Sequence, residues 1–152
     1  MTMFRLSCVA AAAALLVACG GSDDSVRGEL IDPPTVVTTL TAAQIDATTA
    51  ASGLQALSGK AKCDVKVVAL NYRTPGAKEG EMSNASGVML VPGGMCSSAA
   101  PLVANARGTE VLKTRTLANP QDGETFLLAA MYAAQGYAVV ATDYLGYAKS
   151  TY

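Results

Sequence analysis

The sequence contains no histidine. Histidine is the usual base that accepts the proton of a catalytic serine, so these 152 residues lack the base of a Ser-His-Asp triad. They also lack a Gly-x-Ser-x-Gly motif, the sharp turn between strand and helix that presents a nucleophilic serine. Without histidine and without cysteines at metal-ligand spacing, neither a zinc site nor another cofactor is expected. Eleven basic residues stand against twelve acidic ones, so the charge pattern of a nucleic-acid-binding protein is absent as well.

The N-terminus has the pattern of a bacterial export signal. Arg5 precedes an uncharged, apolar stretch over residues 6–17, which is too short for a membrane-spanning helix of about 20 residues. It ends in Leu-Val-Ala-Cys, with Cys19 followed by a Gly/Ser/Asp-rich segment. This is similar to the lipobox of bacterial lipoproteins. We therefore predict a signal peptide over 1–18, lipidation of Cys19 and a tether with an extended arm over 19–39. An ordinary secretory signal with an incidental cysteine is the alternative.

The cysteines agree with export. Cys8 lies within the predicted signal peptide and Cys19 would carry lipid, which leaves Cys63 and Cys96 as an even pair. Disulfides persist in exported proteins, so a bridge between these two is expected. Two buried free thiols are the alternative. Cys63 opens a predicted strand and Cys96 follows its predicted hairpin partner, so the two would come within bridging distance.

Periodicity predicts an α/β fold for residues 40–152. Thr41 and Gln44 fit a capping box at the start of a helix that should run to about residue 57. Val65 and Val67 begin an alternating strand, and the apolar run over 137–142 is typical of a strand covered on both faces. Strands are expected over 63–72, 85–91, 101–106 and 137–142, a hairpin loop over 74–84, and a second helix over 122–135. The order predicts an antiparallel hairpin leading into parallel strands, with helices packed on the sheet.

Four segments carry a family resemblance. They are Asn-Tyr-Arg-Thr at 71–74, Ala-Ser-Gly-Val-Met-Leu-Val-Pro at 85–92, Pro-Leu-Val-Ala-Asn-Ala-Arg-Gly-Thr at 101–109, and Gly-Tyr-Ala-Val-Val-Ala-Thr-Asp-Tyr-Leu-Gly at 136–146. In order and spacing they are similar to the N-terminal part of secreted lipase- and esterase-type α/β-hydrolases. The resemblance implies an incomplete α/β-hydrolase sheet. It also implies a lipid or small ester as the substrate of the full-length family.

The resemblance also implies roles for single residues. The family's third strand ends in His-Gly-Thr, where a backbone N–H helps to form the oxyanion hole. Gly108 and Thr109 match the last two positions, and Thr109 is the candidate donor; a plain turn is the alternative. Arg107 replaces the histidine, which puts the shape of this loop in question. Asp143 and Gly146 match a loop that borders the site, in which the family often has a second glycine where Ala148 stands. There Asp143 is expected to brace the loop, since the triad acid comes later in the family's chain order.

Two functions are therefore expected from the sequence. The first is the N-terminal fragment of an exported lipase- or carboxylesterase-like hydrolase, whose nucleophile, acid and histidine are not in this chain. The second is a non-catalytic lipoprotein that uses a hydrolase-like half-domain for binding or structure. The abrupt end after Tyr152 favours the first. In both, export to the periplasm or outer membrane, with a membrane contact through the lipid anchor, is expected.

Overall fold

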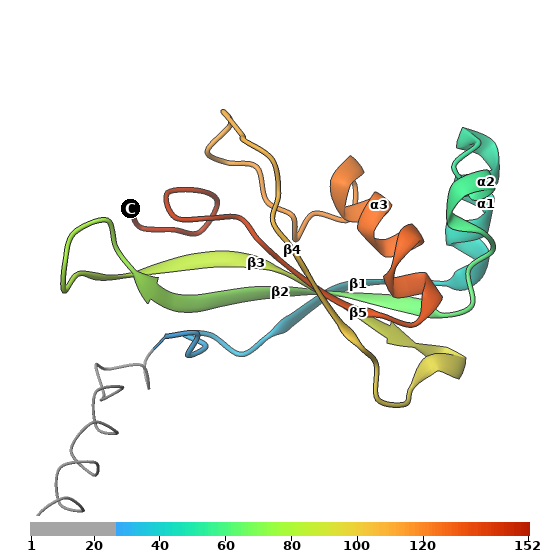
Figure 1. Ribbon diagram of the computed structural model, residues 1–152, viewed down its shortest axis with the longest axis horizontal. Helices are drawn as coiled ribbons and strands as arrows, with labels where there is room; N and C mark the ends of the chain where they lie inside the picture. Colours follow the sequence, from blue (N-terminus) through green and yellow to red (C-terminus); the bar gives the residue numbers. More distant parts are fainter. Residues whose placement is uncertain (1–26) are drawn as a thin grey trace, which may run out of the picture.

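The computed structural model describes residues 27–152; the predicted signal peptide and Cys19 lie outside the described residues. One mixed sheet forms the centre of this region, with helices packed on it (Figure 1). In chain order the elements are β1 (Thr35–Leu40), α1 (Ala42–Ser52), α2 (Gln55–Ser58), β2 (Asp64–Pro75), β3 (Met82–Gly93), the 3-10 turn η1 (Gly94–Cys96), β4 (Leu102–Asn105), α3 (Gly123–Met131), the 3-10 turn η2 (Ala133–Gln135) and β5 (Ala138–Thr142).

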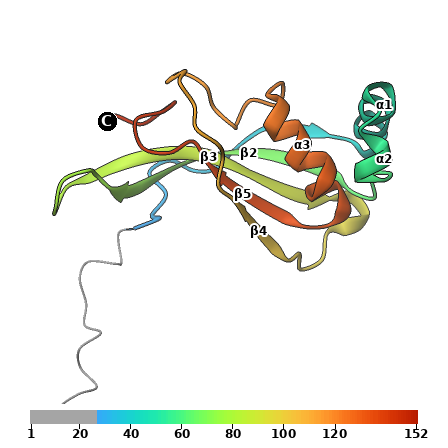
Figure 2. The same cartoon turned by 45° about the horizontal axis from the view of Figure 1, so that its top comes forward.

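The sheet has the strand order β1-β2-β3-β5-β4. The pairs β1–β2, β2–β3 and β3–β5 are antiparallel, whereas β4 and β5 run parallel. The predicted combination of an antiparallel hairpin with a parallel strand–helix–strand unit is thus confirmed. Figures 1 and 2 show α1, α2 and α3 on the same side of the sheet. The incomplete α/β-hydrolase-like sheet expected from the sequence is the fold that the described residues adopt.

The hairpin of β2 and β3 is longer than its sequence pattern indicated. The register runs without a break from Asp64 opposite Gly93 to Pro75 opposite Met82, so the strands take up both ends of the loop predicted over 74–84. Pro92 remains inside β3, although it was expected to stop the strand. It lies beyond the part of β3 that pairs with β5, and proline is tolerated where a strand has a partner on one side only.

The first helix begins as predicted and ends early. Thr41 Oγ1 accepts a hydrogen bond from the N–H of Gln44 at 3.2 Å, and Gln44 Oε1 accepts one from the N–H of Thr41 at 2.9 Å. This reciprocal pair confirms the capping box. The single helix expected up to residue 57 is wrong, because Gly53 takes a left-handed φ of 76° and terminates α1 before the short α2. Glycine adopts this conformation without the steric cost that a Cβ atom brings.

The second helix also differs from its prediction, in its C-terminal part. Asp122 caps α3 by accepting hydrogen bonds from the N–H groups of Glu124 at 3.0 Å and Thr125 at 3.2 Å. The α-helical geometry stops at Tyr132, and η2 completes the segment that was predicted as one helix over 122–135. Leu128, Ala129 and Ala130 form the buried face of α3, whereas Leu127 is 43% exposed.

The core lies between the sheet and the helices. Val65 and Val67 of β2, Val88 and Leu90 of β3, and Val139 of β5 are completely buried and alternate along their strands as a pleated sheet requires. Burying a side chain of this size stabilises the fold by about 1.5–3 kcal/mol. The alternation that predicted the strands therefore also identifies the residues that hold the sheet to its helices.

Gly87 lets β5 approach β3 closely. A Cβ atom at this position would lie 2.4 Å from the carbonyl oxygen of Ala141 in β5, closer than side-chain carbons come to backbone oxygens. The pairing of Gly87 with Thr142 therefore depends on the absence of a side chain.

The edges of the sheet are formed by other strands than β5, which lies between β3 and β4 and is paired on both sides. Within the described residues the edges are β4, where Leu102 is 64% exposed, and β1. β1 itself was predicted only as part of the extended arm over 19–39, and from Thr35 onward this arm pairs with β2. Five of the thirteen described residues of the arm, 35–39, therefore belong to the sheet.

Cys63 and Cys96, the pair singled out from the sequence, are joined by a disulfide with their Cα atoms 5.5 Å apart. Cys63 directly precedes β2, and Cys96 is the last residue of η1, which directly follows β3. Because Asp64 lies opposite Gly93 in the hairpin, the two cysteines meet just beyond its open end. The bridge fastens this end of the hairpin, with the Cys63 side chain buried in the core.

Candidate functional site

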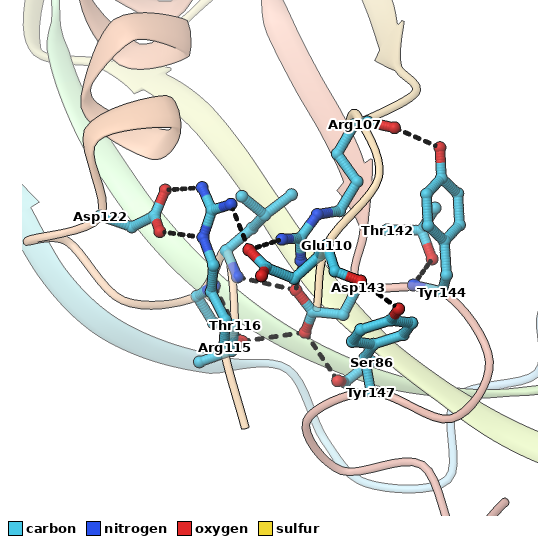
Figure 3. Close-up of polar contacts among 12 residues, drawn as sticks. Ser86, Arg107, Glu110, Arg115, Thr116, Asp122, Thr142, Asp143, Tyr144 and Tyr147 are labelled. Atoms are coloured by element: carbon cyan, nitrogen blue, oxygen red, sulfur yellow. Dashed lines mark hydrogen bonds and ion pairs between the residues drawn. The ribbon is translucent and has the colours of Figure 1, made fainter. Parts of the chain in front are cut away.

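The candidate site lies where the two parallel strands end. β4 is followed by a segment over 106–122 and β5 by a segment over 143–152, here called the β4 loop and the β5 loop. Because parallel neighbours place their carboxyl ends at the same edge of a sheet, the two loops lie side by side, as Figures 1 and 3 show. All four residues that the resemblance assigned to the site, Gly108, Thr109, Asp143 and Gly146, are on these loops.

Asp143 is the buried centre of this region. Its side chain is completely buried. Oδ2 accepts hydrogen bonds from Ser86 Oγ of β3 at 2.7 Å and from Thr116 Oγ1 of the β4 loop at 2.9 Å, and Oδ1 accepts one from the N–H of Leu117 at 2.7 Å (Figure 3). The carboxylate therefore ties both loops to the sheet, which is the bracing role expected for it.

Arg107, at the position where the family has histidine, is buried against Asp143. Its Nη1 lies 3.9 Å from Asp143 Oδ1, its Nη2 donates to Glu110 Oε2 at 3.1 Å, and its guanidinium stands 6.0 Å from the centre of the Tyr147 ring. Arg107 Nε and Nη1 make no hydrogen bond within the described part of the chain. The sequence raised a doubt about loop shape here, and the structure shows the arginine held between two carboxylates and an aromatic ring.

A second arginine extends this ionic network and was not singled out from the sequence. Arg115 donates to Glu110 Oε2 at 2.6 Å, to both carboxylate oxygens of Asp122 at 2.7 and 3.0 Å, and to Glu124 at 3.3 Å. It connects the middle of the β4 loop to the start of α3. The alternation of arginine and acidic residues between 107 and 124 is the signal that could have indicated such a network.

The network lowers the pKa of two of its carboxyl groups, those of Glu110 and Asp122. N–H donation from Leu112, the hydrogen bond from Arg115 and N–H donation from Val111 lower the pKa of Glu110 to about 2. The hydrogen bonds from Arg115 likewise lower the pKa of Asp122, and the same bonds, with those to Glu110, raise the pKa of the Arg115 guanidinium. The β4 loop is therefore held by charges that persist well into the acidic range.

The candidate oxyanion donors lie on the surface of the β4 loop. Gly108 and Thr109 are both exposed. Among residues 27–152, no group accepts a hydrogen bond from the N–H of either residue. Each is therefore free to donate to an external oxygen. On either side of them, Tyr144 Oη donates to the carbonyl of Arg107 at 3.0 Å and Tyr147 Oη donates to the carbonyl of Glu110 at 2.5 Å.

A small cavity of about 300 Å³ opens beside Asp143, between the sheet and the two loops. Its lining includes Ser86 and Gly87 of β3, Thr116 of the β4 loop, and Ala148 and Lys149 of the β5 loop. Most of the surface that it offers is apolar. Its volume is at the lower limit for a small-molecule pocket, which suits a short apolar group.

The described residues do not bring together a nucleophile and a base. Ser86 Oγ donates to Asp143 and sits in the middle of β3, as expected for a strand residue and not for a nucleophile on a turn. The chain has no histidine to activate a serine. No group of His, Cys, Asp and Glu side chains in the described region has the geometry to hold a metal ion. Nor is any helix there both long and apolar enough to cross a bilayer.

The backbone of the β5 loop is unusual at three places. Tyr144, Gly146 and Ala148 have φ values of 70°, 84° and 50°, in the left-handed region that favours glycine. Gly146 meets this requirement, whereas Ala148 stands where the family often has a second glycine. Its N–H donates to the carbonyl of Lys113 in the β4 loop at 2.6 Å. This contact holds the alanine in a conformation that a glycine adopts without strain.

Comparison with solved structures identifies the fold. A single-site variant of the rice cell wall degrading esterase LipA from Xanthomonas oryzae is 38% identical and superposes with a TM-score of 0.71, covering 83% of this chain and 31% of the esterase. A ligand-bound form of the same enzyme gives a TM-score of 0.70. The described residues have an esterase-like fold. A proposed hydrolase from Legionella pneumophila shares this fold at 19% identity, with a TM-score of 0.67 over 82% of this chain and 33% of its own.

The chain spans about a third of the length of these solved proteins. No family model and no curated protein matches its sequence. The structural similarity thus establishes a hydrolase-like fold for the described residues, and the chemistry has to be argued from the two loops.

Proposed function

We propose that residues 40–152 are the N-terminal portion of the catalytic domain of an exported carboxylesterase or lipase. This portion would supply the first half of the sheet and the oxyanion-hole loop, with Thr109 as the N–H donor and Gly108 allowing close approach of the substrate. The serine, its acid and its histidine would come from sequence outside these 152 residues. The observation that carries the proposal is the 38% identity to LipA over 83% of this chain.

The geometry of the β4 loop supports this role. Gly108 and Thr109 are exposed, their N–H groups have no acceptor among residues 27–152, and the flanking carbonyls of their loop are fixed by hydrogen bonds. Donors fixed in advance lower the energy of a developing oxyanion because they need not reorganise during the reaction. The neighbouring apolar cavity of about 300 Å³ suits a short acyl group, which supports a small ester or lipid as substrate.

Export and membrane anchoring are a second part of the proposal. The apolar stretch over 6–17, the Leu-Val-Ala-Cys sequence and the Gly/Ser/Asp tether support removal of residues 1–18 and lipidation of Cys19. Stable anchoring requires more than one acyl chain, each contributing about 0.8 kcal/mol per buried CH₂. Intact-mass measurement of the membrane fraction tests this step. A soluble product without acyl mass, beginning elsewhere than Cys19, contradicts it.

The decisive experiment for catalysis has two arms. The processed chain, residues 19–152, should turn over p-nitrophenyl esters at the background rate, since it contains no histidine. The DNA downstream of codon 152 should encode a Gly-x-Ser-x-Gly motif and a late histidine, and the longer product should hydrolyse the same esters. If the processed chain has esterase activity, and a serine-directed phosphonate abolishes it, the proposal that the catalytic serine and histidine lie outside these 152 residues is wrong.

A non-catalytic lipoprotein is the second candidate. The observation that favours it is that neither a histidine nor a Gly-x-Ser-x-Gly motif occurs anywhere in the 152 residues. In that case the loops at the ends of β4 and β5 serve binding or structure only. An unrelated gene immediately downstream of codon 152 would favour this candidate over the esterase.

A further inference from the structure

We propose that Tyr144 and Tyr147 are positioning residues that fix the backbone of the β4 loop, so that the N–H groups of Gly108 and Thr109 form a preorganised site for a carboxylate-like oxygen. The inference rests on the proposed function and adds to it the residues that orient the oxyanion donors. Neither tyrosine was singled out from the sequence, and neither is itself expected to touch the substrate.

The contacts between the two loops form a regular series. Tyr144 Oη donates to the carbonyl of Arg107, Tyr147 Oη to the carbonyl of Glu110, and the N–H of Ala148 to the carbonyl of Lys113. The accepting carbonyls are three residues apart, and all belong to the backbone of the β4 loop. Fixing a carbonyl fixes the plane of its peptide group, because the peptide bond is planar.

This planarity connects the tyrosines directly to the donors. The carbonyl of Arg107 belongs to the same peptide group as the N–H of Gly108, so the hydrogen bond from Tyr144 sets the direction of that N–H. The bond from Tyr147 to the carbonyl of Glu110 fixes the far side of the segment. The N–H groups of Gly108 and Thr109 lie between these two fixed points, exposed and without an acceptor in the part of the chain that the structure describes.

The surroundings of the tyrosines support a positioning role. Tyr144 holds a left-handed φ of 70°, which is uncommon for a large side chain and is found where surrounding contacts impose it. Its own N–H donates to Thr142 Oγ1 at 3.1 Å, which anchors it to the end of β5. The Tyr147 ring faces the buried guanidinium of Arg107, itself paired with Glu110 and Asp143 (Figure 3). The backbone contact of Tyr144 and the ring contact of Tyr147 therefore restrain the two residues whose hydroxyls donate to the β4 loop.

The test uses NMR on the processed chain with sodium acetate as the carboxylate probe. In the unmodified protein, the amide signals of Gly108 and Thr109 should shift in a saturable way with acetate. Tyr144→Phe and Tyr147→Phe remove one hydroxyl each and keep the ring. They should move the carbonyl ¹³C signals of Arg107 and Glu110, respectively, with little change in the thermal midpoint. In the double variant, acetate binding at the two amides should weaken by at least about tenfold.

Tyr152→Phe is the matched control, because its hydroxyl makes one exposed contact among the described residues, to Glu81 Oε2 at 3.3 Å. It should leave the acetate titration unchanged. If the double variant does not fold, the two single variants still report on the amides. The proposal is wrong if the unmodified amides do not respond to acetate, or if the tyrosine variants bind acetate as tightly as the unmodified protein.

The two proposals fail in different ways. A longer product that has no esterase activity, while the acetate titration behaves as expected, refutes the proposed function and leaves the positioning role intact. If the longer product is active, the double variant should lower kcat with KM nearly unchanged, because the oxyanion forms only in the transition state. If the double variant instead weakens the binding of substrate and of product equally, both loops have lost their fixed conformation as a whole, and the positioning role is overturned.

Discussion

Replacing Asp143 by asparagine should destabilise the fold although it changes the shape of the side chain very little. The carboxylate accepts three hydrogen bonds in the core, and its side chain is completely buried. An asparagine side chain has only one oxygen. It can therefore accept hydrogen bonds at only one of the two oxygen positions of Asp143, and its NH₂ group must face hydrogen-bond donors at the other. If the amide faces Ser86 and Thr116, their hydroxyls lose their acceptor, while they already accept N–H groups from Lys149 at 3.3 Å and Ala118 at 3.1 Å.

The magnitude follows from these contacts. An unsatisfied buried donor costs about 1–3 kcal/mol, and removing one partner of a buried ion pair costs about 3–5 kcal/mol. Arg107 keeps Glu110 as a second partner, so we expect a loss of about 3 kcal/mol in the free energy of unfolding. With a urea dependence of roughly 2 kcal/mol per molar, the unfolding midpoint should fall by about 1.5 M.

Urea unfolding of the oxidised chain, followed by circular dichroism, measures this loss. Asp32→Asn is the control, since Asp32 is exposed and accepts only from Asn71 in a contact of 2.7 Å. It should change stability by less than about 0.5 kcal/mol. Combining Asp143→Asn with Arg107→Met should show a coupling of at least about 1 kcal/mol, because the second change removes the buried cation that has lost one of its two carboxylate partners. A loss below about 1 kcal/mol for Asp143→Asn would refute the bracing role.

Three further predictions concern other parts of the fold. Gly87→Ala should destabilise the sheet by about 2 kcal/mol or more, because its Cβ would lie 2.4 Å from the Ala141 oxygen. In the control Gly93→Ala the nearest atom is 3.8 Å from the new Cβ, so urea unfolding should show a much smaller loss of stability. Replacing both Cys63 and Cys96 by serine should cost about 4 kcal/mol for a bridge between residues 33 apart, and two reactive thiols in the unfolded, unreduced protein would argue against the bridge. The lowered pKa of Glu110 should contribute stability that is fully present above its ordinary pKa of 4.5 and is lost as the pH falls through about 2. Glu110→Gln should therefore flatten the acid side of the stability profile between these values, whereas Glu79→Gln, in the hairpin loop, should not.

Local patterns predicted the elements better than their arrangement. The capping box at Thr41 and the alternation of Val65 and Val67 depend on neighbouring residues only, so they could be recognised without a structure. The apolar run over 137–142 correctly indicated a strand, but not one covered on both faces: Val139 and Ala141 are buried, whereas Val140 and Thr142 on the opposite face are only partly buried. It could not indicate which strands lie beside it, because the placement of β5 between β3 and β4 is decided by packing across the whole sheet. The early end of α1 at Gly53 was missed because another glycine, Gly59, offered an equally good stop.

For the site, too, the sequence indicated which loops are involved but not the long-range contacts of their residues. The resemblance placed Gly108, Thr109, Asp143 and Gly146 on two loops, and the parallel pairing of β4 and β5 brings those loops together. The partners of Asp143 could not be predicted, because Ser86 and Thr116 are 57 and 27 residues away in sequence. Long-range partners of a buried carboxylate are chosen by the fold, and a single sequence carries no local signal for them.

The two departures from the family pattern lie on facing loops, and the same contacts accommodate both. Arg107 replaces histidine, and its charge is held by Asp143 and Glu110 under the ring of Tyr147. Ala148 replaces glycine at a φ of 50°, and its N–H is bonded to the carbonyl of Lys113. A left-handed conformation in a non-glycine residue costs of the order of 1–3 kcal/mol and persists where the surroundings impose it. Tyr144 and Ala148 both bear this cost, and both make one of the hydrogen bonds that join the β5 loop to the β4 loop. The strain and the contacts thus occur at the same residues, as expected if the β5 loop is shaped to hold the backbone around Gly108 and Thr109 in one conformation.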